Sequence, residues 1–232
     1  MNFVLARIKK IDEESSEVRT FHLLPIDTPK PVYQPGHFFI LRLIGEDGKP
    51  IQRSYSAASH PDEPELSFCI KLKGVFTHLL WKLKEGDGIE IDGPYGIFLL
   101  RREDTERVFI GGGVGISALR SHILQTLKEG KPCWLFHSAR TGDALTYCSQ
   151  MEQCAKEQAS FSCHFSITGP DKPEDWGGLA QRIDVPLLLN ALGSLEGKTF
   201  YLCGSKEMCA ELSSALLANN VPKELIKKDE WV

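Results

Sequence analysis

The sequence has no pair of cysteines at C-x2-C spacing, although it contains seven cysteines. An odd number of cysteines at irregular spacing does not favour a disulfide framework. Without C-x2-C, neighbouring residues can build neither a zinc ribbon nor a plant-type iron–sulfur cluster, which needs C-x4-C-x2-C. We therefore expect no metal centre in this chain.

Long apolar runs and blocks of basic residues are absent as well. No stretch reaches the roughly 18 apolar residues that cross a bilayer, and residues 1–10 alternate basic with apolar positions, unlike a signal peptide. A formal net charge of −4 disfavours a nucleic-acid partner, because such partners require a concentrated basic face. The sequence thus predicts a cytoplasmic protein without membrane insertion and without a nucleic-acid partner.

What is present indicates two domains. The 232 residues suffice for two domains of roughly 100–130 residues each. Residues 1–101 hold short apolar runs between Gly and Pro turns, which is typical of an antiparallel barrel or sandwich. Residues 106–232 alternate strand and helix patterns, which is typical of a doubly wound parallel α/β sheet. The charged segment 101–106 is the predicted linker.

The periodicity also predicts individual elements. In the first half, Thr77 is expected to cap a short helix over residues 77–84. In the second half we expect strands at residues 107–110, 133–136, 160–167 and 199–202, and helices at residues 116–127, 147–158, 186–192 and 207–218.

A glycine cluster at residues 111–115 follows one predicted strand and opens a helix. Backbone N–H groups and the helix dipole face an anion in that context. The pattern G-x-G-x-x-A at Gly113, Gly115 and Ala118 is weak by itself, and a tight turn without a ligand is the alternative. The acidic residue that would hold a ribose about 20 positions later is absent, because the next strand ends in residues 137–140, His-Ser-Ala-Arg.

Two further motifs are chemically suggestive. Residues 53–56, Arg-Ser-Tyr-Ser, and residues 74–77, Gly-Val-Phe-Thr, offer a guanidinium, an aromatic ring and a helix start to a phosphorylated aromatic ligand. Residues 203–208, beginning Cys-Gly and ending in Met, place a thiol after a late strand. The alternatives are a core tyrosine, a plain helix cap and a buried cysteine.

These motifs, with Gly93-Pro94-Tyr95-Gly96 between them, occur in an order and spacing that resembles the ferredoxin–NADP reductase superfamily over nearly the whole chain. The resemblance implies a six-stranded antiparallel barrel that binds flavin, followed by an α/β domain that binds NAD(P)H. It also implies an enzyme in which hydride passes from NAD(P)H to bound flavin and electrons then pass to a separate acceptor.

The resemblance further implies roles for individual residues. Arg53 is expected on the flavin phosphate, Tyr55 against the isoalloxazine and Ser56 near its N5. The other residues expected to bind flavin are Ser54, Lys71, Gly74, Val75 and Thr77. Those expected to bind NAD(P)H are Gly112, Gly113, Gly115, Cys203, Gly204 and Met208, with Arg140 as a possible partner of a 2′-phosphate.

The C-terminal residues complete the expected site. The resemblance implies that Trp231 covers one flavin face and that Glu230 assists proton transfer, whereas a frayed tail is the alternative. Ser56, Cys203, Glu230 and Trp231 are therefore the expected catalytic residues. The extra phosphate site at residues 74–77 favours tightly held FAD over a loosely bound substrate flavin, and FMN is the less favoured alternative. Either NADH or NADPH is the hydride donor, with a lean toward NADH because residues 166–170 lack the Ser-Arg of NADPH-specific relatives.

The sequence does not identify the electron acceptor. A ferredoxin, an iron–sulfur oxygenase component or a cytochrome would suit a reductase, and four lysines form a possible basic rim for an acidic partner: Lys71, Lys73, Lys82 and Lys84. One alternative is a reductase that releases free reduced flavin. Another is a flavin-binding electron-transfer subunit of a larger complex, which the scarcity of cysteines near the C-terminus disfavours.

Overall fold

The computed structural model describes residues 2–104, 106–170 and 172–231, except for the side chain of residue 231. These residues form two compact units. The first comprises the chain up to residue 99 together with residues 120–122, and the second comprises residues 100–119 and 123–232. Each unit has its own apolar core.

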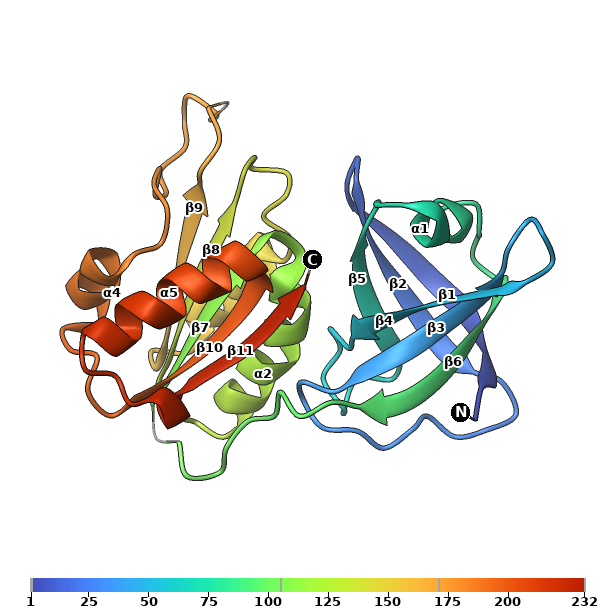
Figure 1. Ribbon diagram of the computed structural model, residues 1–232, viewed down its shortest axis with the longest axis horizontal. Coiled ribbons are helices and arrows are strands. Elements are labelled where there is room, and N and C mark those ends of the chain that lie inside the picture. Colours follow the sequence, from blue (N-terminus) through green and yellow to red (C-terminus); the bar gives the residue numbers. More distant parts are fainter. Residues whose placement is uncertain (1, 105, 171, 232) are drawn as a thin grey trace. The chain divides into compact units, whose positions relative to one another are not determined.

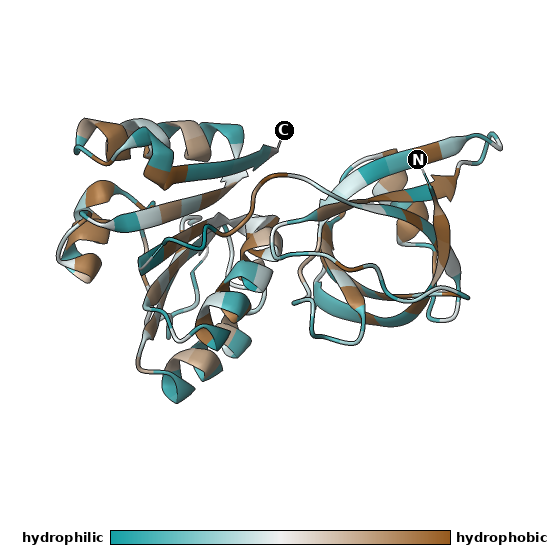
Figure 2. Cartoon of the chain, turned by 90° about the horizontal axis from the view of Figure 1, so that it is seen from below, coloured by the Kyte–Doolittle hydropathy of each residue, from teal (hydrophilic) through white to brown (hydrophobic). Residues whose placement is uncertain are grey.

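The first unit is a six-stranded antiparallel sheet with one short helix (Figure 1). Its strand order is β4-β3-β6-β1-β2-β5, and the outer strands β4 and β5 contact each other, so the sheet curls into a barrel (Figure 2). Its elements are β1 (Val4–Ser15), β2 (Val18–Pro25), β3 (Phe38–Ile44), β4 (Pro50–Ser56), β5 (Leu66–Lys71), α1 (Val75–Leu80) and β6 (Gly88–Tyr95). The antiparallel six-stranded prediction is confirmed.

The helix of this unit differs from the expected one. It begins at Val75, and its N-cap is Gly74 at φ 82° rather than Thr77. The Thr77 hydroxyl lies inside the first turn, where it donates to the Gly74 carbonyl at 3.0 Å and accepts the Lys73 N–H at 2.7 Å. After Leu80 the backbone hydrogen bonds join residues three apart, as in turns, instead of four apart. The helix therefore ends four residues earlier than predicted.

The second unit is a five-stranded parallel sheet of order β11-β10-β7-β8-β9, with α5 across one face (Figure 1) and helices on both faces (Figure 2). Its strands are β7 (Glu106–Gly112), β8 (Cys133–Ala139), β9 (Phe161–Ile167), β10 (Lys198–Ser205) and β11 (Ile226–Trp231). Its helices are η1 (Gly113–Gly115), α2 (Ile116–Lys128), α3 (Cys148–Glu157), α4 (Val185–Leu192), α5 (Lys206–Ala218) and η2 (Lys223–Leu225). The doubly wound parallel sheet is confirmed.

The strand order locates the binding edge of this sheet. Successive strands β7, β8 and β9 step outward on one side, whereas β10 and β11 lie on the other side of β7. The order therefore reverses between β7 and β10. Open α/β sheets bind ligands beyond the carboxyl ends of their strands at such a switch point.

The segment predicted as a linker is anchored to the second unit. Asp104 is 4% exposed, and its carboxylate accepts hydrogen bonds from the Thr199 hydroxyl at 2.8 Å and the Tyr201 hydroxyl at 2.6 Å. The buried Arg107 donates to the Arg101 carbonyl at 2.9 Å. These bonds fix residues 101–104 against the amino-terminal ends of β7 and β10.

Within the described ranges, no three His, Cys, Asp or Glu residues gather as a metal site. No helix there has the length and apolar character needed to cross a membrane. All seven cysteines are free thiols.

Candidate functional site

The Arg53 side chain is available to an anion on the barrel. It lies on β4, whose only strand partner among the described residues is β3, and it is exposed. Its guanidinium donates to the Gln52 carbonyl at 2.7 Å, and no carboxylate of the described residues pairs with it. The neighbouring Ser54 is exposed too.

Tyr55 connects this strand with α1. Its ring centroid lies 5.9 Å from that of Phe76, at an interplanar angle of 33°. Burial raises the pKa of Tyr55 to about 12, so the phenol is neutral at physiological pH. The aromatic ring of the motif is therefore held beside the first turn of α1.

The start of α1 offers backbone donors. No side chain of the described residues caps it, and the first N–H groups of a helix have no partner within the helix. A Cβ at Gly74 would meet nothing within 4 Å, and Val75 is 69% exposed. Because the Thr77 hydroxyl is engaged within the turn, the backbone N–H groups are the donors that fit a phosphate here.

Two of the four lysines of the predicted basic rim are paired with carboxylates. The Lys71 ammonium lies 3.2 Å from Glu17, and the Lys82 ammonium lies 2.7 Å from Glu46. Lys71 is thus less available to a flavin phosphate than the sequence suggested. Ser56 ends β4 opposite Phe38 and is half-buried.

The glycine loop ends β7 at the switch point of the second unit. Gly113 adopts φ 53° with open space where a Cβ would be. No side chain of the described residues caps η1 or α2, and neither has an acidic residue in its first turn. The loop therefore combines a helix start that no side chain of the described residues caps with open space at Gly113, which fits a pyrophosphate.

Met208 packs over two glycines at the same edge. A Cβ on Gly112 would lie 2.6 Å from the Met208 sulfur, and a Cβ on Gly204 would lie 2.4 Å from its methyl carbon. α5 begins one turn earlier, where the Ser205 hydroxyl accepts the Met208 N–H at 3.3 Å. The sequence-predicted residues of β7, β10 and α5 are thus brought together. Gly115 is buried at the start of α2.

Cys203 lies between Gly111 of β7 and Asp229 of β11 in the strand register. It is buried, and burial raises the pKa of its thiol well above the usual value. A neutral buried thiol is not a nucleophile.

The remaining expected residues lie around this edge. Arg140 is exposed directly after β8, and its carbonyl accepts the Gly169 N–H at 2.9 Å. Glu230 pairs with Gly204 in the register of β11, but its carboxylate is exposed and lies 3.6 Å from Lys228. The backbone of Trp231 belongs to β11, whereas its side chain, and with it the expected cover over one flavin face, lies outside the described part.

His137 was not recognised as a site residue from the sequence. It is buried near the end of β8, and its Nε2 lies 3.0 Å from the Gly113 carbonyl. Burial lowers the pKa of His137 to about 4. A histidine on an apolar strand ordinarily indicates a core position. The one clue in the sequence was that His137 stands close to where the ribose-binding acidic residue was expected.

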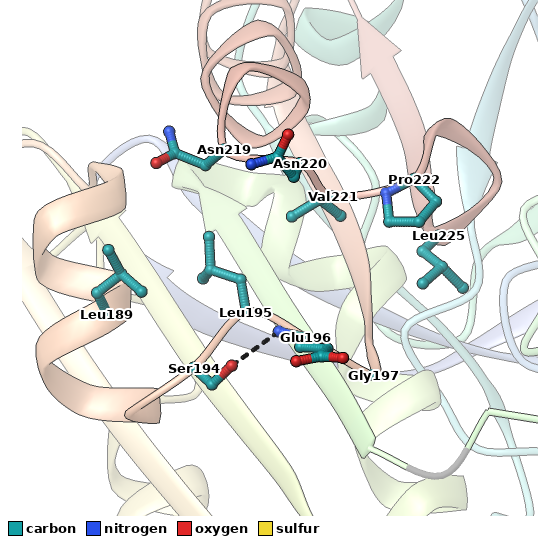
Figure 3. Close-up of a pocket in the computed structure, with 10 residues that line it drawn as sticks. All are labelled: Leu189, Ser194, Leu195, Glu196, Gly197, Asn219, Asn220, Val221, Pro222 and Leu225. Atoms are coloured by element: carbon teal, nitrogen blue, oxygen red, sulfur yellow. Dashed lines mark hydrogen bonds between the residues drawn. The ribbon is translucent and has the colours of Figure 1, made fainter.

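A separate pocket lies at the opposite edge of the second unit (Figure 3). It has a volume of about 520 Å³ and is lined by Leu189, Ser194, Leu195, Glu196, Gly197, Asn219, Asn220, Val221, Pro222 and Leu225. Gly197 precedes β10, whereas Gly204 lies near its end, so the pocket is on the order of 20 Å from the glycine loop. It is distinct from the candidate site.

Comparisons with known proteins agree with this geometry. Residues 5–99 match the model of an oxidoreductase FAD-binding domain, and residues 109–213 match that of an oxidoreductase NAD-binding domain. A curated relative, which is one subunit of the Na(+)-translocating NADH-quinone reductase of Histophilus somni, is 30% identical over 93% of this chain. The chain spans only 58% of that relative's length.

Two solved structures have the same fold. The FAD/NAD-binding domain of a nitric oxide dioxygenase from Vibrio cholerae gives a TM-score of 0.88 at 22% identity and covers 98% of both chains. A ferredoxin NADP+ reductase from Neisseria gonorrhoeae, with FAD and NADP bound, gives 0.84 at 22% identity and covers 99% of both chains. At this identity the likeness concerns the fold alone.

Proposed function

Since the chain belongs to the ferredoxin–NADP reductase superfamily, we propose that it oxidises NADH with bound FAD and passes the electrons to a separate protein. The observation that carries the proposal is the presence in one chain of two oxidoreductase cofactor domains, each with an open, anion-accepting turn. These turns are the start of α1 in the barrel and the glycine loop in the parallel sheet.

FAD, when bound, supplies a two-electron acceptor that returns electrons one at a time. The chain's own residues bind and orient. Arg53 and the first N–H groups of α1 hold the anionic part of FAD, and Tyr55 lies along its ring system. The loop from Gly112 to Gly115 binds the pyrophosphate of NADH, and Met208 keeps that loop and Gly204 in register.

We propose that the chain works as a component of a larger assembly and not as an autonomous reductase. The curated relatives are named as subunits of an NADH-quinone reductase, which favours the alternative that the sequence alone disfavoured. This chain, which covers 58% of that relative's length, matches an FAD-binding and an NAD-binding domain model. The redox partner in this proposal is a protein-bound one-electron acceptor on the cytoplasmic side of that assembly.

NADH is the donor we propose. A Cβ at Gly169 would lie 2.2 Å from the Arg140 carbonyl, so this position has no room for a second basic side chain that would help Arg140 hold a 2′-phosphate. Arg140, which is exposed directly after β8, would be the cation for a 2′-phosphate. One cation without a second partner gives little discrimination in favour of NADPH.

Anaerobic mixing of the FAD-loaded chain with NADH or NADPH tests this proposal. We expect NADH to bleach the flavin absorbance at least about tenfold faster than NADPH, and ferricyanide, a one-electron acceptor, to restore the colour. A chain that takes up no FAD, or whose FAD is not bleached by NADH, would contradict the proposal.

Gel filtration separates the alternatives. An electron-transfer component retains FAD through the column and reduces ferricyanide without added flavin. A reductase that releases free flavin instead loses its colour on the column and needs added FAD or FMN for turnover.

A further inference from the structure

His137 lies directly behind the glycine loop. In the sheet register it pairs with Gly111 of β7 on one side and Phe165 of β9 on the other. Its ring carbon Cδ2 lies 3.6 Å from the position that a Cβ would take on Gly111. The side chain therefore points to the face from which the loop rises.

One hydrogen bond joins this side chain to the loop. Nε2 lies 3.0 Å from the Gly113 carbonyl, and a carbonyl only accepts, so Nε2 carries the proton. Nδ1 is then an acceptor, and it is buried without a partner among the described residues. A phenylalanine would fill the same space without that unsatisfied atom, so the bond from Nε2 is what distinguishes histidine here.

The Gly113 carbonyl also accepts the Ile116 backbone N–H at the end of η1, so the bond from His137 is a second anchor for this peptide group. In a planar trans peptide the N–H points opposite to the C=O. With the Gly113 carbonyl turned toward His137, the Val114 N–H is directed to the other side of the loop. Gly113 itself adopts φ 53°, with open space where a Cβ would be.

We infer that His137 is a positioning residue for the dinucleotide, and that it acts by fixing the Gly113–Val114 peptide so that its N–H faces the pyrophosphate. This inference rests on the proposed function. It adds a residue of β8 to a site that the motifs placed on β7, β10 and α5.

ADP-ribose is the probe that tests it, because it contains the pyrophosphate but no nicotinamide. In the FAD-loaded full chain, H137F keeps an aromatic ring but removes the donor, and we expect its Kd for ADP-ribose to rise roughly tenfold. H137Q places an amide N–H near the position of Nε2 and is expected to stay within about threefold of the unchanged chain. The KM for NADH should rise in H137F while kcat changes less than about twofold.

His164 provides a matched control on the neighbouring strand. It stacks on Phe136 with ring centroids 4.7 Å apart, and within the described ranges it has no hydrogen bond to the loop, so H164F should leave the Kd unchanged. FAD content and thermal unfolding report whether each variant folds. If H137F does not fold, H137L, which also lacks the donor, is measured in its place with the same expected rise in the Kd for ADP-ribose.

Three results would overturn the inference. H137F binding ADP-ribose as tightly as the unchanged chain would remove the role of the donor. If H137Q lost as much affinity as H137F, the effect would come from packing and not from the donor. The same would follow if H164F lost as much affinity as either variant. An unchanged chain that fails to bind ADP-ribose would instead refute the proposed function, and the inference with it.

Discussion

At the scale of single residues, His137 predicts how stability depends on pH. The unfolded chain protonates this histidine below about pH 6.5, whereas burial keeps it neutral in the folded chain down to a pKa of about 4. Between these values the unfolded state binds more protons, so stability falls as the pH falls. The expected loss is about 3 kcal/mol between pH 6.5 and 4. Urea unfolding at a series of pH values measures this loss in the unchanged chain and in H137Q. The same dependence of the unfolding free energy on pH in both would contradict the prediction.

The residue scale also marks a limit of sequence analysis. The glycines at 112, 113 and 204 were identified because their type and spacing carry information about backbone approach. The hydrogen bond from His137 to Gly113 spans 24 positions and depends on strand register, which residue spacing does not encode. For the same reason, the ion pairs that neutralise Lys71 and Lys82 were not foreseen.

At the scale of elements, the position of Arg53 on β4 leads to a prediction about FAD binding. A guanidinium on an outer strand without a carboxylate partner among the described residues can pair with a phosphate. We expect Arg53→Gln to weaken FAD binding roughly tenfold or more, and Arg53→Lys to weaken it less because the charge remains. The measurement is the Kd for FAD, followed by flavin fluorescence. Thermal unfolding of the FAD-free variants should match the unchanged chain, and unaltered FAD affinity in Arg53→Gln would exclude the role.

Elements with clear periodicity were predictable, and those set by pairing were not. α2 and α5 follow their apolar spacing closely. β11 was missed because its middle residues, Lys227 to Glu230, are all charged, and it is stabilised by pairing with β10 at the edge of the sheet. The start of α1 was misplaced because Gly74, at positive φ, takes the N-cap position that a threonine would ordinarily occupy.

At the scale of the whole molecule, Asp104 ties together parts of the second unit that are far apart in sequence. Its carboxylate binds hydroxyls 95 and 97 positions later. We expect Asp104→Ala to destabilise the second unit by roughly 2–4 kcal/mol, because two buried hydroxyls lose their acceptor, and Asp104→Asn to cost less. Urea unfolding followed by tryptophan fluorescence gives the values. A loss of under about 0.5 kcal/mol in Asp104→Ala would show that water replaces the carboxylate.

Burial of the thiols affects how the protein withstands oxidation. Burial raises the pKa of Cys133, Cys148, Cys163, Cys203 and Cys209 above the usual value, and only the thiolate reacts readily with peroxides and alkylating agents. Flavoproteins that handle electrons in air work close to such oxidants. Packing thus also shields the buried sulfurs of Cys133, Cys203 and Cys209 without a disulfide, whereas those of Cys148 and Cys163 belong to half-buried residues.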